Sequence, residues 1–172
     1  HPMIIDYACN GMRSDFMDIY LGAKCTFFIS NGCGIDAIPY IFRKPIVYVD
    51  LVPLGITSTY SSKFISTTKN HWLRDSGRLM TFQEIFESGA AHVTLSSNYE
   101  AMGIDLIEST PDDIAAVVLE MESRLNGTWK ADEDDEELQQ QFWTLFPKTN
   151  WHGEIRSRIG AEFLRRHRDW LK

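Results

Sequence analysis

The sequence has few cysteines and no long apolar run. Its three cysteines, Cys9, Cys25 and Cys33, cannot all pair with one another, and no two of them form a C-x-x-C motif. We therefore expect neither a disulfide framework nor a zinc knuckle. No apolar run approaches the ~20 residues of a membrane-spanning helix, and the first residues lack the charged and apolar regions of a signal peptide. These absences predict a cytoplasmic protein without a membrane span.

Basic residues are also scarce. Lys and Arg number 17 against 24 Asp and Glu, which gives a net charge of −7. Because broad nucleic-acid binding usually needs a basic face, we expect no nucleic-acid partner. The histidines do not have the spacing of metal ligands, so no metal site is predicted. The four concerned are His71, His92, His152 and His167.

The residues that are present are typical of a folded α/β protein. The chain is 44% hydrophobic and 12% aromatic, and 172 residues can bury a core. Strand and helix patterns alternate, which predicts a parallel sheet flanked by helices. The expected strands are Met3–Tyr7, Thr26–Ile29, Ile46–Val49 and Ile104–Ile107. The expected helices begin near Ser14, Asp36, Thr81 and Thr110, and the first of them should turn Phe16, Ile19 and Tyr20 inward.

The segment Thr26–Asp50 is the most informative. It joins a short apolar strand, a glycine-rich turn, a helix and a second apolar strand in one βαβ-sized unit. Glycines let the backbone approach a ligand, and a helix that begins beyond them directs free N–H groups at an anion. The candidate ligand-binding residues are Ser30, Asn31, Gly32, Cys33, Gly34 and Asp36. A turn of this kind is also common in α/β proteins that bind nothing there, so both interpretations stay open.

Candidate cations for a bound anion lie outside this unit. Arg13 follows the first expected strand at the same edge of the sheet, and it is the preferred single cation for nucleotide contact. An equally good interpretation of Arg13 is a surface arginine that contacts no ligand. The loop after Asp50 leads to further cations that could fold over the turn or simply solvate the loop. These are Lys63, Lys69, His71, Arg74 and Arg78.

The composition changes beyond Trp129, and we divide the chain into an α/β domain over 1–130 and a helical tail over 131–172. An acidic run, Asp132–Glu137, leads into a helix, and a last helix is expected over His152–Leu171. One side of the last helix is apolar, with Ile155, Ile159, Phe163 and Trp170. The other side carries Arg156, Arg158, Arg165, Arg166 and Arg168, which could oppose the acidic run. The tail packs on the domain or on a partner chain, and we expect a homodimer.

The order of the motifs resembles the C-terminal half of GT-B glycosyltransferases and of UDP-N-acetylglucosamine 2-epimerase. The resemblance lies in the segments IDYA, SDFMDIYLGAKCTFFISNGCG and IDAIPYIFRKPIVYVD. In those proteins a Ser-Gly-Gly type turn precedes a helix with Ala-Pro, then Gly-Lys-Pro and a strand. Asn31-Gly32-Cys33, Ile38-Pro39 and Lys44-Pro45 take these places here. NHWLRDSGRLMTFQEIFESG and HGEIRSRIGAEFLRRHRDWL are similar to segments of a group of bacterial glycosyltransferases, and the resemblance covers nearly the whole chain.

The resemblance implies a Rossmann-like sheet that forms part of a GT-B C-terminal domain. It implies a nucleotide-sugar donor as substrate, with the diphosphate on Asn31–Gly34, and no further cofactor. Relatives commonly bind the donor ribose through a glutamate of this helix, and Asp36 is the acidic residue found here. The N-terminal acceptor domain is missing, so the chain would be a fragment that is inactive alone. The alternative is a non-catalytic α/β module for binding or assembly.

Overall fold

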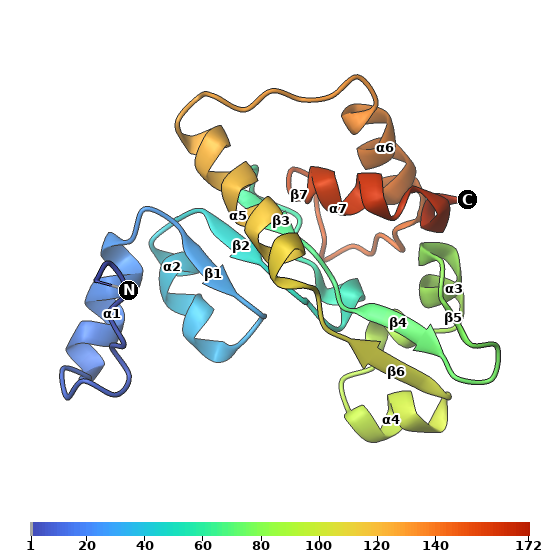
Figure 1. Ribbon diagram of the computed structural model, residues 1–172, viewed down its shortest axis with the longest axis horizontal. Helices are drawn as coiled ribbons and strands as arrows, with labels where there is room; N and C mark the ends of the chain where they lie inside the picture. Colours follow the sequence, from blue (N-terminus) through green and yellow to red (C-terminus); the bar gives the residue numbers. More distant parts are fainter. Residues whose placement is uncertain (1) are drawn as a thin grey trace.

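A four-stranded parallel sheet organises the chain (Figure 1). The computed structural model describes residues 2–172. The strands are β1 (Phe28–Ser30), β2 (Ile46–Tyr48), β3 (Phe64–Ser66) and β7 (Arg158–Ile159), in the order β1-β2-β3-β7. All three neighbouring pairs are parallel. The α/β prediction is therefore confirmed, and two of the expected strands lie where the sequence placed them, within one or two residues.

Side chains alternate between the two faces of this sheet. Val47 and Ile65 pack on one face against Val117 and Met121 of α5 (Pro111–Leu125). Residues of the opposite face, including Tyr48, form a separate small core beside α2 (Ala37–Ile41). The predicted strand at 46–49 is fully buried because helices cover β2 on both sides.

A second sheet is antiparallel. It contains β4 (Asn70–Leu73), β5 (Arg78–Leu79) and β6 (Ile104–Ile107), in the order β5-β4-β6. The strand expected over Ile104–Ile107 is confirmed, but it pairs with β4 and not with the parallel sheet. The hairpin formed by β4 and β5 was not expected, because its short strands alternate weakly between apolar and polar residues.

The helices with strong capping signals are confirmed. Thr81 and Thr110 each form a capping box, before α3 (Phe82–Glu87) and α5. The helix expected after the acidic run is confirmed as α6 (Asp135–Leu145), which begins within the run. The other helical elements are α1 (Asp15–Lys24), η1 (Gly34–Asp36), η2 (Leu54–Ile56), η3 (Ala90–His92), α4 (Ser96–Ala101), α7 (Ala161–Arg166) and η4 (Arg168–Leu171). None of the helices within residues 2–172 has the length and apolar character needed to cross a bilayer.

The N-terminal predictions need correction. Residues 3–7 form no strand, because the chain turns back there and the Tyr7 hydroxyl hydrogen-bonds to the backbone of Ser14. Ser14 does cap α1, but Phe16, Ile19 and Tyr20 are 70%, 50% and 46% exposed, so the inward face was assigned wrongly. Helix α1 instead packs on α2 through Gly22, where an added Cβ would come within 2.7 Å of the Ile38 side chain.

The single helix expected over His152–Leu171 is also wrong. Its first half is a loop and the strand β7, which joins the parallel sheet beside β3. Only α7 and η4 are helical, because Gly153 has a left-handed backbone and Gly160 stands before α7. Ile159 and Phe163 are buried in the core shared with α3 and α6. The tail therefore covers this apolar stripe within its own chain.

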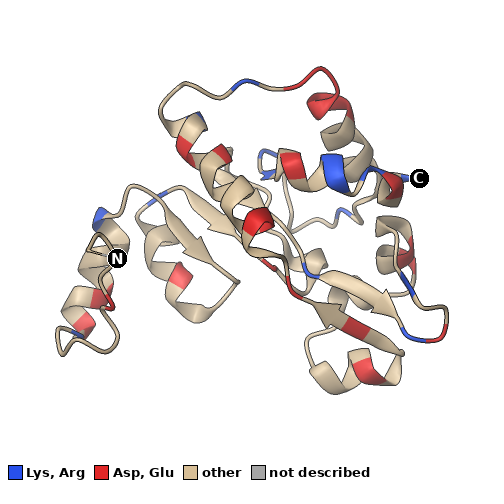
Figure 2. Cartoon of the chain, viewed as in Figure 1, with Lys and Arg blue, Asp and Glu red and all other residues tan. Residues whose placement is uncertain are grey.

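Three of the five tail arginines pair with the acidic run (Figure 2). The other two, Arg156 and Arg166, pair with carboxylates outside it. Arg165 pairs with Asp132 and Asp135, and Arg168 pairs with Asp134. Arg158 pairs with Glu136 at 2.5 Å. These ion pairs hold the start of α6 against β7, α7 and η4.

Candidate functional site

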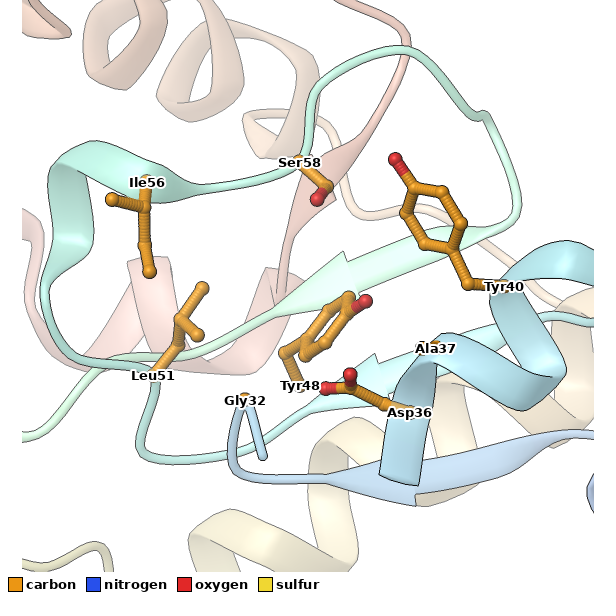
Figure 3. Close-up of a pocket in the computed structure, with 8 residues that line it drawn as sticks. All are labelled: Gly32, Asp36, Ala37, Tyr40, Tyr48, Leu51, Ile56 and Ser58. Atoms are coloured by element: carbon orange, nitrogen blue, oxygen red, sulfur yellow. The ribbon is translucent and has the colours of Figure 1, made fainter. Parts of the chain in front are cut away.

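A cavity of about 280 Å³ lies at the carboxyl ends of β1 and β2 (Figure 3). Open parallel sheets bind ligands at this end of their strands. One wall comes from η1 and α2, and the opposite wall comes from the loop that follows β2. The lining residues are Gly32, Asp36, Ala37, Tyr40, Tyr48, Leu51, Ile56 and Ser58.

Ser30 ties the turn after β1 to the helical segment beyond it. Its buried hydroxyl donates to Oδ2 of Asp36 at 2.9 Å and accepts from the N–H of Gly32 at 3.1 Å. The sulfur of Cys33 lies 3.7 Å from the same hydroxyl. Ser30 thus holds the Asp36 carboxylate at the mouth of the turn.

Gly32 fits its place because it has no side chain. Its φ is +86°, and an added Cβ would lie 2.8 Å from Cδ1 of Leu51. L-residues rarely adopt this backbone conformation, and the contact with Leu51 leaves no room for a methyl group. The glycine therefore keeps the floor of the cavity open.

The cavity offers hydroxyl groups and a negative charge. Tyr48 is 6% exposed, and burial raises the pKa of its hydroxyl, with a further contribution from the Asp36 carboxylate. The phenol therefore stays protonated and can donate a hydrogen bond, while Asp36 can accept one. No Lys or Arg is among the residues that line this cavity. These groups suit a ligand rich in hydroxyls, such as a sugar or a ribose.

The structure brings together part of the predicted site. Gly32 and Asp36 line the cavity, and Ser30 supports them from behind. Cys33 contacts Ser30 but is exposed, and Asn31 and Gly34 lie on the exposed turn outside the lining. One amide expected to meet an anion, that of Gly32, is already bonded to Ser30.

The cations considered for this site lie elsewhere. Arg13 precedes α1, where its closest carboxylate is Asp18 at 3.9 Å, and it does not line the cavity. Lys69, Arg74 and Arg78 form ion pairs with Glu108, Asp105 and Glu84, and His71 is buried. Lys63 lies just before β3, at the amino end of the sheet.

Sequence reasoning missed most of the wall residues. Tyr40 and Tyr48 are aromatic residues next to the glycine turn in the same βαβ unit, which is the signal that could have identified them. Leu51, Ile56 and Ser58 come from the loop expected to leave the carboxyl end of a strand, and that expectation is confirmed. Their convergence depends on how the loop folds back, which no local pattern encodes.

Within residues 2–172, no cluster of three or more His, Cys, Asp or Glu has the arrangement needed to hold a metal ion. No protein-family model, curated protein or solved structure matches the chain. The site must therefore be interpreted from its own geometry and from the resemblance of its motifs.

Proposed function

We propose that the chain is the nucleotide-sugar-binding part of a GT-B type glycosyltransferase. The observation that carries this proposal is the cavity at the carboxyl ends of β1 and β2, where Gly32 leaves space and Asp36 presents a carboxylate. Its position at the turn between β1 and α2 agrees with the resemblance of the SNGCG turn to the donor site of those enzymes.

In this proposal the hydroxyls of the ribose or sugar bind to Asp36 and Tyr48. A carboxylate accepts hydrogen bonds from a vicinal diol, and the protonated phenol can donate one. The diphosphate lies along the exposed residues Asn31–Gly34, outside the cavity and at the start of η1. The three free cysteines agree with a cytoplasmic location, where thiols stay reduced.

Thermal unfolding with UDP, GDP, CMP and ADP sugars tests the proposal, because a ligand that binds the native state raises the midpoint. We expect one base to give a rise that the variant Asp36→Asn loses. Asp169→Asn is the matched control, since Asp169 is an exposed residue of the last turn. No rise with any nucleotide sugar, or an equal rise in both variants, would contradict the proposal.

We also propose that the chain forms a homodimer, which would give it an assembly role as the second candidate function. The observation that favours this role is the open edge of β1. Within residues 2–172, β1 pairs only with β2, so its other edge is open (Figure 1). Ile29 is exposed on β1 itself, and Phe16 and Ile19 are exposed on α1. An open edge with apolar neighbours is a ready site for pairing with a second chain.

A further inference from the structure

A second hollow, of about 360 Å³, lies at the opposite end of the parallel sheet. Three cations line it, and each comes from the residues just before a strand: Arg43 before β2, Lys63 before β3 and Arg156 before β7. Because the strands are parallel, their amino ends meet at one edge, and the sheet order places the three strands side by side. The topology therefore gathers charges that are far apart in the sequence.

These cations face no acid within the hollow. Arg156 pairs with Glu154 at 2.9 Å, but Arg43 and Lys63 form no ion pair within residues 2–172. No Asp or Glu lines this hollow, although the chain carries a net charge of −7. A depression lined by charges of one sign concentrates the electrostatic field and attracts a ligand of the opposite sign.

Arg43 occupies a backbone position that usually belongs to glycine. The N–H of Lys44 bonds to the Pro39 carbonyl at 2.9 Å, and that of Arg43 bonds to the Tyr40 carbonyl at 3.1 Å. These two bonds form a Schellman motif at the end of α2, with Arg43 at φ +55°. A non-glycine residue in this conformation is strained, and such residues gather at functional sites. The Arg43 side chain thus occupies a position where the backbone conformation favours glycine.

Aromatic rings form the rest of the hollow. The rings of Tyr40, Tyr60 and Phe64 pack with centroids 5.1 to 5.9 Å apart. Tyr40 and Tyr60 remain 40% and 44% exposed, so part of the flat apolar surface of each ring is open, and each ring also carries a phenol hydroxyl. This combination suits the C–H face and the hydroxyls of a sugar ring.

We infer that this hollow binds an anionic saccharide. The carboxylate or phosphate of the ligand pairs with Arg43 and Lys63, and a sugar ring packs on Tyr40 and Tyr60. Tyr40 also lines the first cavity, so the two sites adjoin along α2. The inference does not depend on the proposed donor site, because its charges belong to the second hollow alone.

Isothermal titration calorimetry at low salt with four probes tests this inference. Trigalacturonic acid carries carboxylates, glucose 6-phosphate carries a phosphate, maltotriose has rings without charge, and inorganic phosphate has charge without a ring. We expect at least one of the two anionic saccharides to bind, and both other probes to bind at least about tenfold more weakly, as the loss of one charge-assisted contact predicts. Equal binding of inorganic phosphate or of maltotriose would overturn the assignment, and so would the absence of saccharide binding.

Two variants locate the binding. Arg43→Gly keeps the Schellman motif and should fold at least as well as the parent chain, yet it should lose saccharide affinity by roughly tenfold. Lys63→Gln should lose a similar factor, whereas Lys130→Gln removes the same charge from an exposed loop and should leave the affinity unchanged. If Lys130→Gln weakens binding as much, the effect is only long-range charge and the inference fails. Nucleotide-sugar binding should persist in Arg43→Gly, so the two proposals fail independently.

Discussion

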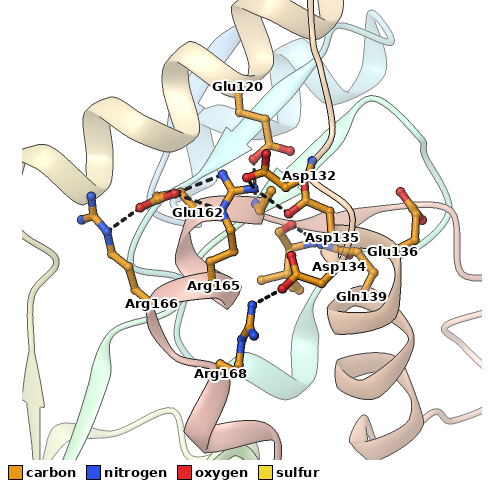
Figure 4. Close-up of polar contacts among 12 residues, drawn as sticks. Glu120, Asp132, Asp134, Asp135, Glu136, Gln139, Glu162, Arg165, Arg166 and Arg168 are labelled. Atoms are coloured by element: carbon orange, nitrogen blue, oxygen red, sulfur yellow. Dashed lines mark hydrogen bonds and ion pairs between the residues drawn. The ribbon is translucent and has the colours of Figure 1, made fainter.

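Arg165 of α7 binds the carboxylate of Asp135, 30 residues earlier in the chain, at 2.6 Å (Figure 4). The Asp135 side chain is only 1% exposed, and its second oxygen accepts the N–H of Asp132 at 3.0 Å. Arg165 also binds Asp132 and Glu162. The acidic run is therefore partly structural, because one of its carboxylates is buried at the junction of α6 and α7.

Replacing Arg165 should destabilise the fold strongly. Arg165→Met keeps the length of the side chain but leaves Asp135 buried without its cation, which typically costs about 3–5 kcal/mol. Urea unfolding monitored by far-ultraviolet circular dichroism measures the difference. Lys172→Met is the control, since both members of its pair with Asp169 are largely exposed and its loss should be undetectable. Similar midpoints for the two variants would show that the buried pair contributes little.

Stability should fall as the pH drops from about 6.5 to 4, and His71 should account for much of the loss. The ring is fully buried, its Nδ1 lies 2.9 Å from the Lys69 carbonyl oxygen, and its Nε2 has no hydrogen-bond partner among residues 2–172. Burial lowers the pKa of His71 from 6.5 to about 4. Between these values the unfolded chain binds the extra proton, so acidification favours unfolding, by about 2 kcal/mol at pH 5.

The variant His71→Phe should reduce this pH dependence. Phenylalanine can keep the edge contact with Tyr99, whose ring centroid lies 5.8 Å from that of His71, and it cannot take up a proton. Part of the dependence should remain, because burial also lowers the pKa of His167 to about 4. Urea unfolding of the parent chain and of the variant at pH 7 and pH 5 measures how much folding stability each loses between the two pH values. An unaltered difference between the two pH values would exclude His71 as the cause.

Local signals predicted the elements that local contacts define. The capping boxes at Thr81 and Thr110 lie within a single turn of their helices, and both helices were predicted correctly. Strand β7 was missed because it pairs with β3, far away in sequence, and because its two residues carry no strand pattern of their own. The N-terminal strand was predicted wrongly because an apolar run forms a strand only where an edge pairs with it.

The candidate site also has one part that local sequence signals predict and another part that they do not. Gly32 and Asp36 could be predicted, since the turn and the start of a helix are local features. Ile56 and Ser58 reach the cavity only because the loop beyond β2 folds back to form the wall opposite α2, which depends on tertiary packing. The second hollow could not be predicted at all, because Arg43, Lys63 and Arg156 meet only through the order of the strands.

The two glycines of the candidate donor turn should respond differently to alanine. Gly32→Ala places a methyl group against Leu51 at positive φ, so we expect a loss of about 1–3 kcal/mol in stability and a narrower cavity that binds nucleotide sugar more weakly. An added Cβ at Gly34 meets no atom within 4 Å, and its φ is not positive. Gly34→Ala should therefore leave stability nearly unchanged. Thermal unfolding with and without nucleotide sugar compares the two variants. Equal losses of stability in both would contradict the geometry of the turn.

Light scattering at micromolar concentration should give twice the 19.8 kDa mass of one chain. The tail cannot supply the interface through Phe163, because this residue is 6% exposed in the core, so Phe163→Asp should unfold the protein and not merely dissociate it.

The interface should instead involve the open edge of β1. Ile29 is 46% exposed on that strand, and Ile29→Lys places a charge where a second chain would pair. We expect this variant to be monomeric with an unchanged circular dichroism spectrum. A monomeric parent chain would reject the dimer, and a dimeric Ile29→Lys variant would place the interface away from the edge.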